Sequence, residues 1–385
     1  PPRSTLFPYT TLFRSVTAGH QAGGLIGGAD GKSGSNISNC YATGKVTANG
    51  WDAGGLIGKL QGYVTINSCH AIGDVTGESS TGGLIGQCGH ATLNNCYATG
   101  KATGSSGGYG GDGVGGFIGT SFAKLSDCYS TGNASGLAQI GGFIGYCQLD
   151  EIDAITNCYA TGNAVCTGVN RHAGGFIGYN KMAAACYIDK CYAIGVASNT
   201  KNDAGGLIGV NESVGSISNC YAVGDVAGNY NAGGFIGRNI KGDVSNSYAA
   251  GAVTSSSPDT ESGGGGFIGR NDAGSISKCY AFGVSVTKNT VAASNYFNRI
   301  AGRCDTAGLL SDNYANTDML FILMDGTQST TFPGLVSASA TTKRGAHITL
   351  VEAKTQAKYV TNGWNFDTTW KIAEGVEYPK LKWQQ

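Results

Sequence analysis

Short runs of hydrophobic and polar residues follow one another along most of the chain, and the same runs return in the same order. The pentapeptide Gly-Gly-(Leu/Phe)-Ile-Gly occurs nine times, at spacings of 26 to 33 residues, beginning at Gly23, Gly54, Gly82, Gly115, Gly141, Gly174, Gly205, Gly233 and Gly265. Each copy is followed by a hexapeptide of the form "NCYATG", as at residues 39–44. Repetition at a period of 20–50 residues is typical of solenoids and related repeat folds.

The repeated unit has the pattern of strands rather than of helices. Its apolar residues do not recur every three or four positions, and it is rich in Gly, Thr, Val, Ile and Tyr. Runs such as "GGLIG", "NISNCYATG" and "KVT" predict three strands per unit, separated by turn-forming residues. The sequence therefore predicts an all-β fold, a right-handed parallel β-solenoid of about nine coils. At about 4.8 Å per coil it would be about 43 Å long.

Three parts of the chain are expected. Residues 1–15 share nothing with the repeats and resemble a non-native leader. The repeats occupy residues 16–298, and a C-terminal capping region occupies residues 299–385. An open stack exposes unpaired strand edges. The residues expected to cover that open end are Trp364, Phe366, Trp370, Ile372 and Tyr378.

Alternation along a strand assigns the hexapeptide side chains to two faces. In Cys40-Tyr41-Ala42-Thr43, either Cys and Ala point inward or Tyr and Thr do. Cysteine and alanine are among the most frequently buried residues, so we predict thiols inside and tyrosines outside. The reverse assignment stays open, because a corner at the preceding Asn would shift the parity. By the same argument the repeated Ile, rather than the Leu or Phe before it, is assigned to the core.

Thirteen cysteines raise the question of disulfides. Eight of them occupy the hexapeptide position, which Ser247 fills in the remaining unit: Cys40, Cys69, Cys96, Cys128, Cys158, Cys191, Cys220 and Cys279. Stacked equivalents would have Cβ atoms about 4.8 Å apart, beyond the disulfide range of about 3.5 to 4.5 Å. Reduced, buried thiols are predicted.

The outward residues would form an aromatic stripe, and this is the predicted binding surface: Tyr41, His70, Tyr97, Tyr129, Tyr159, Tyr192, Tyr221, Tyr248 and Tyr280. A continuous exposed aromatic surface usually marks a binding site. The alternative is that the rings stack on one another to stabilise the sheet, or are covered by loops and the C-terminal segment.

Charge and candidate chemistry narrow the choice of function. The 25 basic and 25 acidic residues balance, with no block of like charge, which argues against nucleic acid or an anionic membrane as partner. The apolar run "MLFILM" at 319–324 is too short to span a membrane. The five histidines show no metal-binding spacing, and the densest acidic cluster, "LDEID" at 149–153, is interpreted as a solvated corner loop. No catalytic residue, metal or cofactor is predicted.

The motif "AGGLIG", followed by "NISNCYATG" and a "VT" strand, resembles the GLUG repeat of bacterial cell-surface and secreted proteins, which include adhesins and non-catalytic regions of some immunoglobulin A proteases. The resemblance spans residues 16 to about 297, with His70 and Ser247 as the chief departures. It implies a non-catalytic module on or outside a bacterial cell, a rigid stalk or adhesin segment that binds glycans or a host or neighbouring surface protein. The alternatives are a self-assembling fibre protomer and a polysaccharide-acting β-helix enzyme.

Overall fold

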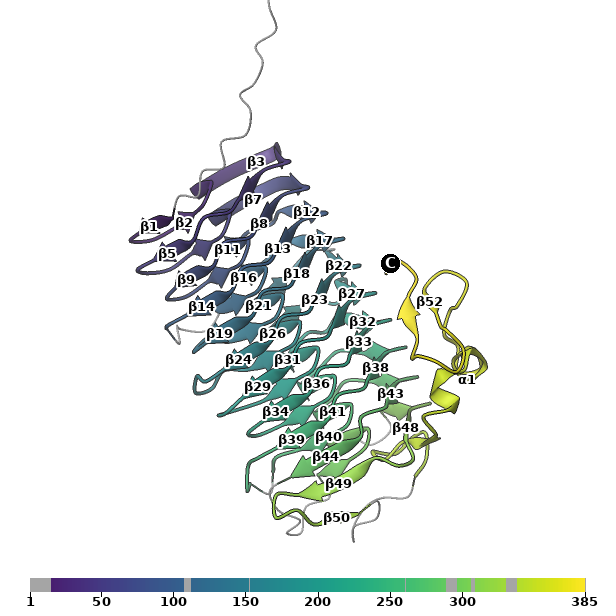
Figure 1. The fold of residues 1–385 in the computed structure, drawn as a ribbon. Helices are drawn as coiled ribbons and strands as arrows, with labels where there is room; N and C mark the ends of the chain where they lie inside the picture. The colour runs from purple at the N-terminus through teal and green to yellow at the C-terminus, as the bar shows by residue number, and fades with distance from the viewer. Residues whose placement is uncertain are drawn as a thin grey trace, which may run out of the picture.

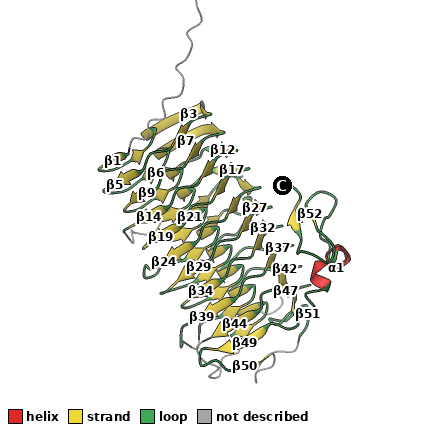
Figure 2. Cartoon of the chain, in the orientation of Figure 1, coloured by secondary structure: helices red, strands yellow, loops and turns green. Residues whose placement is uncertain are grey.

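The computed structural model describes residues 15–106, 112–151, 153–259, 261–288, 296–305, 309–329 and 338–384. Within them, short parallel strands stack into a β-solenoid of about ten coils (Figure 1), and only one short α-helix appears (Figure 2). The predicted fold class is therefore confirmed. Nearly all of the predicted leader lies outside the described residues, as do residues 107–111.

A typical coil contains five strands instead of the predicted three. The third coil consists of β10 (Thr81–Gly82), β11 (Ile85–Cys88), β12 (Thr92–Asn94), β13 (Tyr97–Ala98) and β14 (Ala102–Gly104). Each pairs in parallel with its equivalents in the neighbouring coils. The two longer predicted runs are broken by corners, because the chain must turn several times to close one coil.

Equivalent strands form four faces. The Val-Thr sheet runs from β1 (Val16–Ala18) to β49 (Leu320–Leu323), whose edge carries the antiparallel β50 (Gln328–Ser329). The Gly sheet runs from β2 (Ala22–Gly23) to β45 (Phe297–Asn298).

The Tyr sheet comprises β4 (Tyr41–Ala42), β8 (His70–Ala71), β13, β18 (Tyr129–Ser130), β23 (Tyr159–Ala160), β28 (Tyr192–Ala193), β33 (Tyr221–Ala222), β38 (Tyr248–Ala249), β43 (Tyr280–Ala281), β48 (Tyr314–Asn316) and β51 (Ala346–Ile348).

The Ile sheet carries two strands in most coils. The first set is β3 (Ile26–Ser38), β7 (Ile57–Asn67), β11, β16 (Ile118–Ser121), β21 (Ile144–Leu149), β26 (Ile177–Met182), β31 (Ile208–Asn211), β36 (Ile236–Asn239), β41 (Ile268–Asn271) and β46 (Ala301–Cys304). The second set is β12, β17 (Lys124–Ser126), β22 (Ala154–Thr156), β27 (Tyr187–Asp189), β32 (Ser216–Ser218), β37 (Val244–Ser245), β42 (Ile276–Ser277) and β47 (Leu310–Ser311). In the first two coils both parts belong to one long strand, β3 or β7.

The cysteine ladder lies inside, as predicted. Seven of its eight thiols are fully buried, and Cys40 in the first coil is half-buried. All thirteen cysteines are free. The reverse assignment is excluded, since the tyrosines project from the opposite face of the same short strands.

A left-handed corner precedes every copy of the hexapeptide strand. The residue before the ladder position has φ between 48° and 56° in Asn39, Ser68, Asn95, Asp127, Asn157, Lys190, Asn219, Asn246, Lys278 and Asp312. Short polar side chains tolerate this conformation best, which accounts for the frequency of Asn and Asp here. The corner turns the backbone so that the ladder side chain enters the core.

Both apolar residues of the pentapeptide are buried, which corrects the assignment of Ile alone to the core. Phe143 and Ile144 are each fully buried, and so are their equivalents in the other coils except the first. The chain bends at the second glycine, so strict alternation does not apply across these two positions. The phenylalanines also stack, with ring centroids of Phe117 and Phe143 4.7 Å apart.

The stack continues past residue 298, where the repeats were predicted to end. β46 pairs with β41, β47 with β42, and β49 with β44 (Ser285–Lys288). Tyr314 lies in register with Tyr280, within the sequence "DNYANT" at 312–317. This tenth coil was missed because Asn313 replaces the cysteine and "NRIAG" replaces the pentapeptide.

The C-terminal segment, residues 349–384, covers a flank of the solenoid rather than its end, as Figure 1 shows. It contains a 3-10 turn (Glu352–Lys354), α1 (Gln356–Thr361) and the hairpin of β52 (Trp370–Lys371) and β53 (Lys380–Leu381). The expectation that its aromatic residues cover the open end is wrong, because they pack with tyrosines of the Tyr sheet in a second hydrophobic core. No helix in the described ranges is long and apolar enough to cross a bilayer.

Candidate binding surfaces

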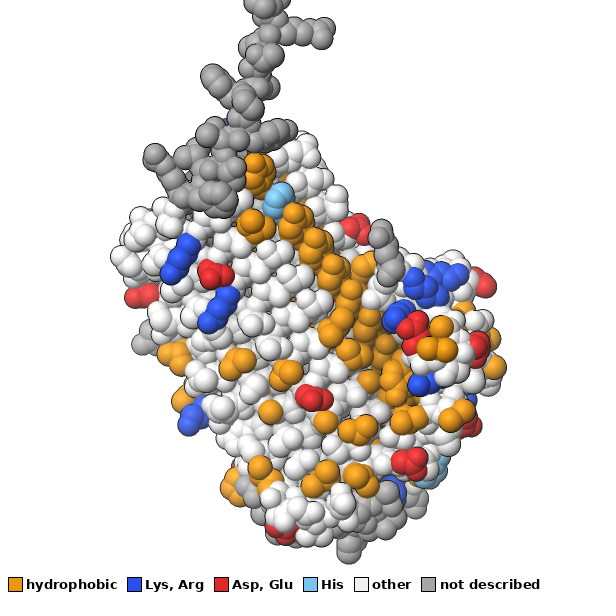
Figure 3. Space-filling model, viewed as in Figure 1, with side chains coloured by type: hydrophobic (Ala, Val, Ile, Leu, Met, Phe, Trp, Pro, Cys, Tyr) orange, Lys and Arg blue, Asp and Glu red, His pale blue; other side chains and the backbone are white. Residues whose placement is uncertain are grey.

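The outward aromatic residues form one stacked ladder along the Tyr sheet. Neighbouring ring centroids are 4.5 to 5.2 Å apart from Tyr41 to Tyr248, and the ring planes differ by 1° to 6°. Figure 3 shows a line of hydrophobic side chains that crosses this face and meets the C-terminal segment. We call the line from Tyr41 to Tyr280 the tyrosine ladder.

The C-terminal segment divides this ladder into two halves. Tyr192, Tyr221, Tyr248 and Tyr280 belong to a second hydrophobic core with aromatic residues of the segment, and we call them the covered half. For these four tyrosines the alternative that the C-terminal segment covers the rings is confirmed, and the predicted exposed surface is wrong, because the segment packs over them. The free half comprises Tyr41, His70, Tyr97 and Tyr129, together with Tyr159 at its boundary, which packs partly against the segment. Tyr41 is 44% exposed, whereas Tyr280 is fully buried.

Three tryptophans of the segment contact the solenoid in the same way. The indole N–H of Trp364 donates to the Lys278 carbonyl at 3.0 Å, and that of Trp383 donates to the Lys190 carbonyl at 3.2 Å. Trp370 Nε1 lies 3.3 Å from Asn219 Oδ1. All three acceptors belong to left-handed corner residues next to the ladder. The segment therefore contacts the corner and the adjacent ring edge together.

The tyrosine hydroxyls supply further contacts. Tyr248 donates to the Pro379 carbonyl at 2.9 Å, and Gln384 Nε2 donates to the Tyr221 hydroxyl at 2.6 Å. Burial raises the pKa of both phenols, Tyr221 and Tyr248, well above its usual value. Burial also raises the pKa of Tyr159, at the boundary between the halves, to about 12. The phenols stay neutral at physiological pH and act as hydrogen-bonding groups.

The free half has the same stacked rings and left-handed corners as the covered half, but the segment is not packed over them. Its corner residues are Asn39, Ser68, Asn95, Asp127 and Asn157, all left-handed. The first four are exposed, whereas Asn157 is half-buried. The three corner residues that bind tryptophan are also half-buried. The ring of Trp383 already reaches the boundary, with its centroid 6.1 Å from that of Tyr159.

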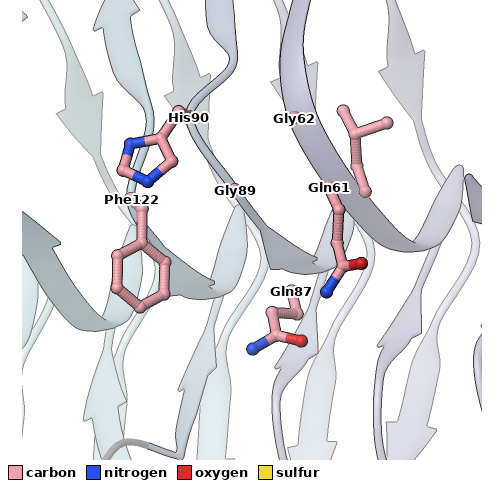
Figure 4. A pocket seen from close by; sticks show the side chains of 7 residues that line it. Gln61, Gly62, Gln87, Gly89, His90 and Phe122 are labelled. Atoms are coloured by element: carbon pink, nitrogen blue, oxygen red, sulfur yellow. The ribbon is translucent and has the colours of Figure 1, made fainter. Parts of the chain in front are cut away.

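A groove crosses the outer face of the Ile sheet in the first four coils. It consists of three adjoining hollows of about 230 to 280 Å³, and any two of them have one lining residue in common, which is Lys59, Gln61 or Gln87. One end is bounded by Trp51, Asp52 and Asp112, and the other by His90 and Phe122 (Figure 4).

Sequence reasoning missed this groove, because its floor comes from outward positions that vary between coils. Burial raises the pKa of Asp52 to about 6, although Lys59 Nζ lies 3.8 Å from its Oδ2 and opposes the shift.

Asp150 and Glu151 are exposed, as expected of a solvated loop, but the loop also meets a histidine of another coil. The structure brings His90 together with Glu151 and Asp153, with one ligand atom from each within 4.8 Å of the others. Both loops follow the same strand position, β11 in one coil and β21 in another. This equivalent position in the repeat was the signal in the sequence that the two loops lie on the same side of the solenoid.

Comparison with known proteins supports the repeat assignment. The family described as "The GLUG motif" matches residues 18–47 and 228–254. Halomucin of Haloquadratum walsbyi (strain DSM 16790 / HBSQ001) is 32% identical over 165 residues, which is 38% of this chain and 2% of halomucin. The chain thus spans a very small part of that relative.

A solved structure from Bacteroides ovatus, provisionally described as an immunoglobulin A1 protease, aligns with 84% of this chain and 87% of its own. Its sequence identity is 18% and its TM-score is 0.46.

Proposed function

Because this chain is a GLUG-motif repeat protein, we propose that it is a rigid, non-catalytic surface module outside the cell that binds an extended polypeptide through the free half of its tyrosine ladder. The extracellular location is supported by the GLUG resemblance and by the match to halomucin. Eleven of the thirteen thiols are buried, which protects them from oxidation in such a place.

The observation that carries this proposal is the docking of the C-terminal segment on the covered half. That segment binds a stacked tyrosine surface through indole contacts at three corners, those of Lys190, Asn219 and Lys278, and through bonds to phenol hydroxyls. The free half repeats the same rings and the same corner conformation. A partner segment with spaced aromatic residues would find the same contacts there.

Stacking also indicates what the free half binds least well. Each internal ring has its two faces against its neighbours, so mainly edges and hydroxyls reach the solvent. An edge contact suits another aromatic side chain, since aromatic pairs favour edge-to-face and tilted arrangements. A sugar that packs on a ring face would find few faces available along this stripe.

Selection of displayed peptides on the intact chain tests this function. Enriched peptides should carry aromatic residues, and their affinity, measured by biolayer interferometry, should fall about tenfold or more in the variant Tyr97→Ala/Tyr129→Ala. The matched control is Thr99→Ala/Thr131→Ala, two exposed residues in the same coils. Equal affinity in both variants, or no enrichment of aromatic peptides, would contradict the proposal.

A glycan bound in the groove is a second candidate. Trp51, 51% exposed, presents an aromatic surface beside carboxylate and amide groups. Glycan-array binding that disappears in Trp51→Ala, and persists in Tyr97→Ala/Tyr129→Ala, would favour the groove over the ladder. Fibre assembly and polysaccharide cleavage remain alternative predictions.

A further inference from the structure

Two loops from non-adjacent coils meet on the outer rim of the Ile sheet. His90 lies between β11 and β12, and Glu151 and Asp153 lie between β21 and β22. The intervening coil has a short connection, with two residues between β16 and β17. The longer loop therefore crosses it, and the Tyr63 hydroxyl of β7 donates to Glu151 Oε1 at 2.7 Å.

Neighbouring groups hold the three side chains in place. The His90 ring stacks on Tyr63, with centroids 5.4 Å apart, and is tilted against Phe122 at 6.1 Å. The thiol of Cys186 donates to the Glu151 carbonyl at 2.6 Å. The side chains are therefore positioned by several coils rather than by one mobile loop, which reduces the entropy lost when a ligand is bound.

The cluster combines an imidazole nitrogen with surplus negative charge. His90 Nδ1 is buried, although the side chain as a whole is 33% exposed, and it has no hydrogen-bond partner among the described residues. Its nearest acid among them is Asp150, with Oδ1 at 3.6 Å. Asp150, Glu151 and Asp153 bring three carboxylates together, and Lys124 acts on Asp153 to offset part of that charge. A buried imidazole nitrogen and converging carboxylates are metal-ligand groups.

We propose that His90, Glu151 and Asp153 form a binding site for a divalent metal ion of the zinc class. Their ligand atoms lie within 4.8 Å of one another, as separate ligands of one ion must. An imidazole with two carboxylates suits zinc and similar transition metals, whereas calcium and magnesium favour oxygen ligands alone. Three protein ligands leave a position for water, next to the hollow lined by Gln61 and Gln87. The ion would brace the third coil against the fifth.

Titration of the intact, tag-free, reduced chain with Zn²⁺ by isothermal calorimetry tests this site. One saturable site is expected, weakened about tenfold or more in each of His90→Gln, Glu151→Gln and Asp153→Asn. The matched control is Glu78→Gln, an exposed carboxylate at the corner that leads into the coil of His90, which should bind as the unsubstituted chain does. Glu151→Gln is nearly isosteric and can still accept from Tyr63, so this variant is expected to fold.

Cobalt substitution separates this site from the cysteines. The Co²⁺ complex should show visible d–d absorption without a thiolate-to-cobalt band, because its ligands are nitrogen and oxygen. A thiolate band, no saturable Zn²⁺ binding, or full binding in all three variants would overturn the proposal. Tighter binding of Ca²⁺ than of Zn²⁺ at the same residues would overturn the metal class.

Discussion

At the residue scale, the ladder cysteine serves as a hydrogen-bond acceptor inside the core. The backbone N–H of Cys96 donates to Cys128 Sγ at 3.4 Å, and the Cys128 thiol donates to the Ser126 carbonyl at 3.1 Å. The corner before each ladder residue turns this N–H into the core, where an unpaired donor would be costly.

Two natural departures from cysteine keep the same bond. In the eighth coil Ser247 Oγ accepts from the Cys220 N–H at 3.1 Å, and in the tenth Asn313 Oδ1 accepts from the Cys279 N–H at 2.9 Å. The sequence predicted burial of these cysteines from their general preference. It did not predict their bonds, which depend on the corner conformation.

Replacing one ladder cysteine tests this role. Cys128→Ala should lower the free energy of unfolding by about 1 to 3 kcal/mol, because the Cys96 N–H is left unpaired in the core. Cys128→Ser keeps an acceptor and should cost less. Urea denaturation of both variants measures the difference, and equal losses would show that the thiol acts only by filling space.

At the element scale, the second glycine of each pentapeptide allows the close approach of neighbouring coils. A Cβ on Gly142 would lie 2.1 Å from the Gly175 carbonyl oxygen of the next coil, a backbone atom that cannot move alone. This close approach gives a physical reason for much of the content of 65 glycines. It also bends the chain so that Phe143 and Ile144 both enter the core, which alternation alone could not predict.

A single added methyl group tests the close approach. Gly142→Ala should destabilise the chain by about 3 kcal/mol, near the upper end of the usual cost of overpacking. Gly19→Ala is the control, because a Cβ there meets no atom of the described residues within 4 Å. Thermal unfolding of the two variants gives the comparison. A Gly142→Ala chain as stable as the control would mean that the coils can separate freely.

At the scale of the whole molecule, periodicity predicted the solenoid and the line of tyrosines, but not what lies against them. Which half of the ladder is covered depends on where residues 349–384 dock, and nothing in their own pattern specifies a flank over an end. The meeting of His90 with Glu151 likewise depends on loop lengths in three coils. The repeats set the position of each residue along the solenoid axis, whereas departures from the repeat create the candidate sites.

Tyrosine modification with readout by mass spectrometry tests most directly the claim that one ladder is half covered and half free. In the intact chain, Tyr41, Tyr97 and Tyr129 should react much faster than Tyr221, Tyr248 and Tyr280. Trp370, fully buried against Tyr248 at a centroid distance of 6.2 Å, anchors the cover.

The variant Trp370→Ala should therefore increase the reactivity of Tyr221 and Tyr248 and leave that of Tyr97 unchanged. Uniform reactivity along the ladder of the intact chain, or no response to Trp370→Ala, would contradict the division of the ladder into a covered and a free half.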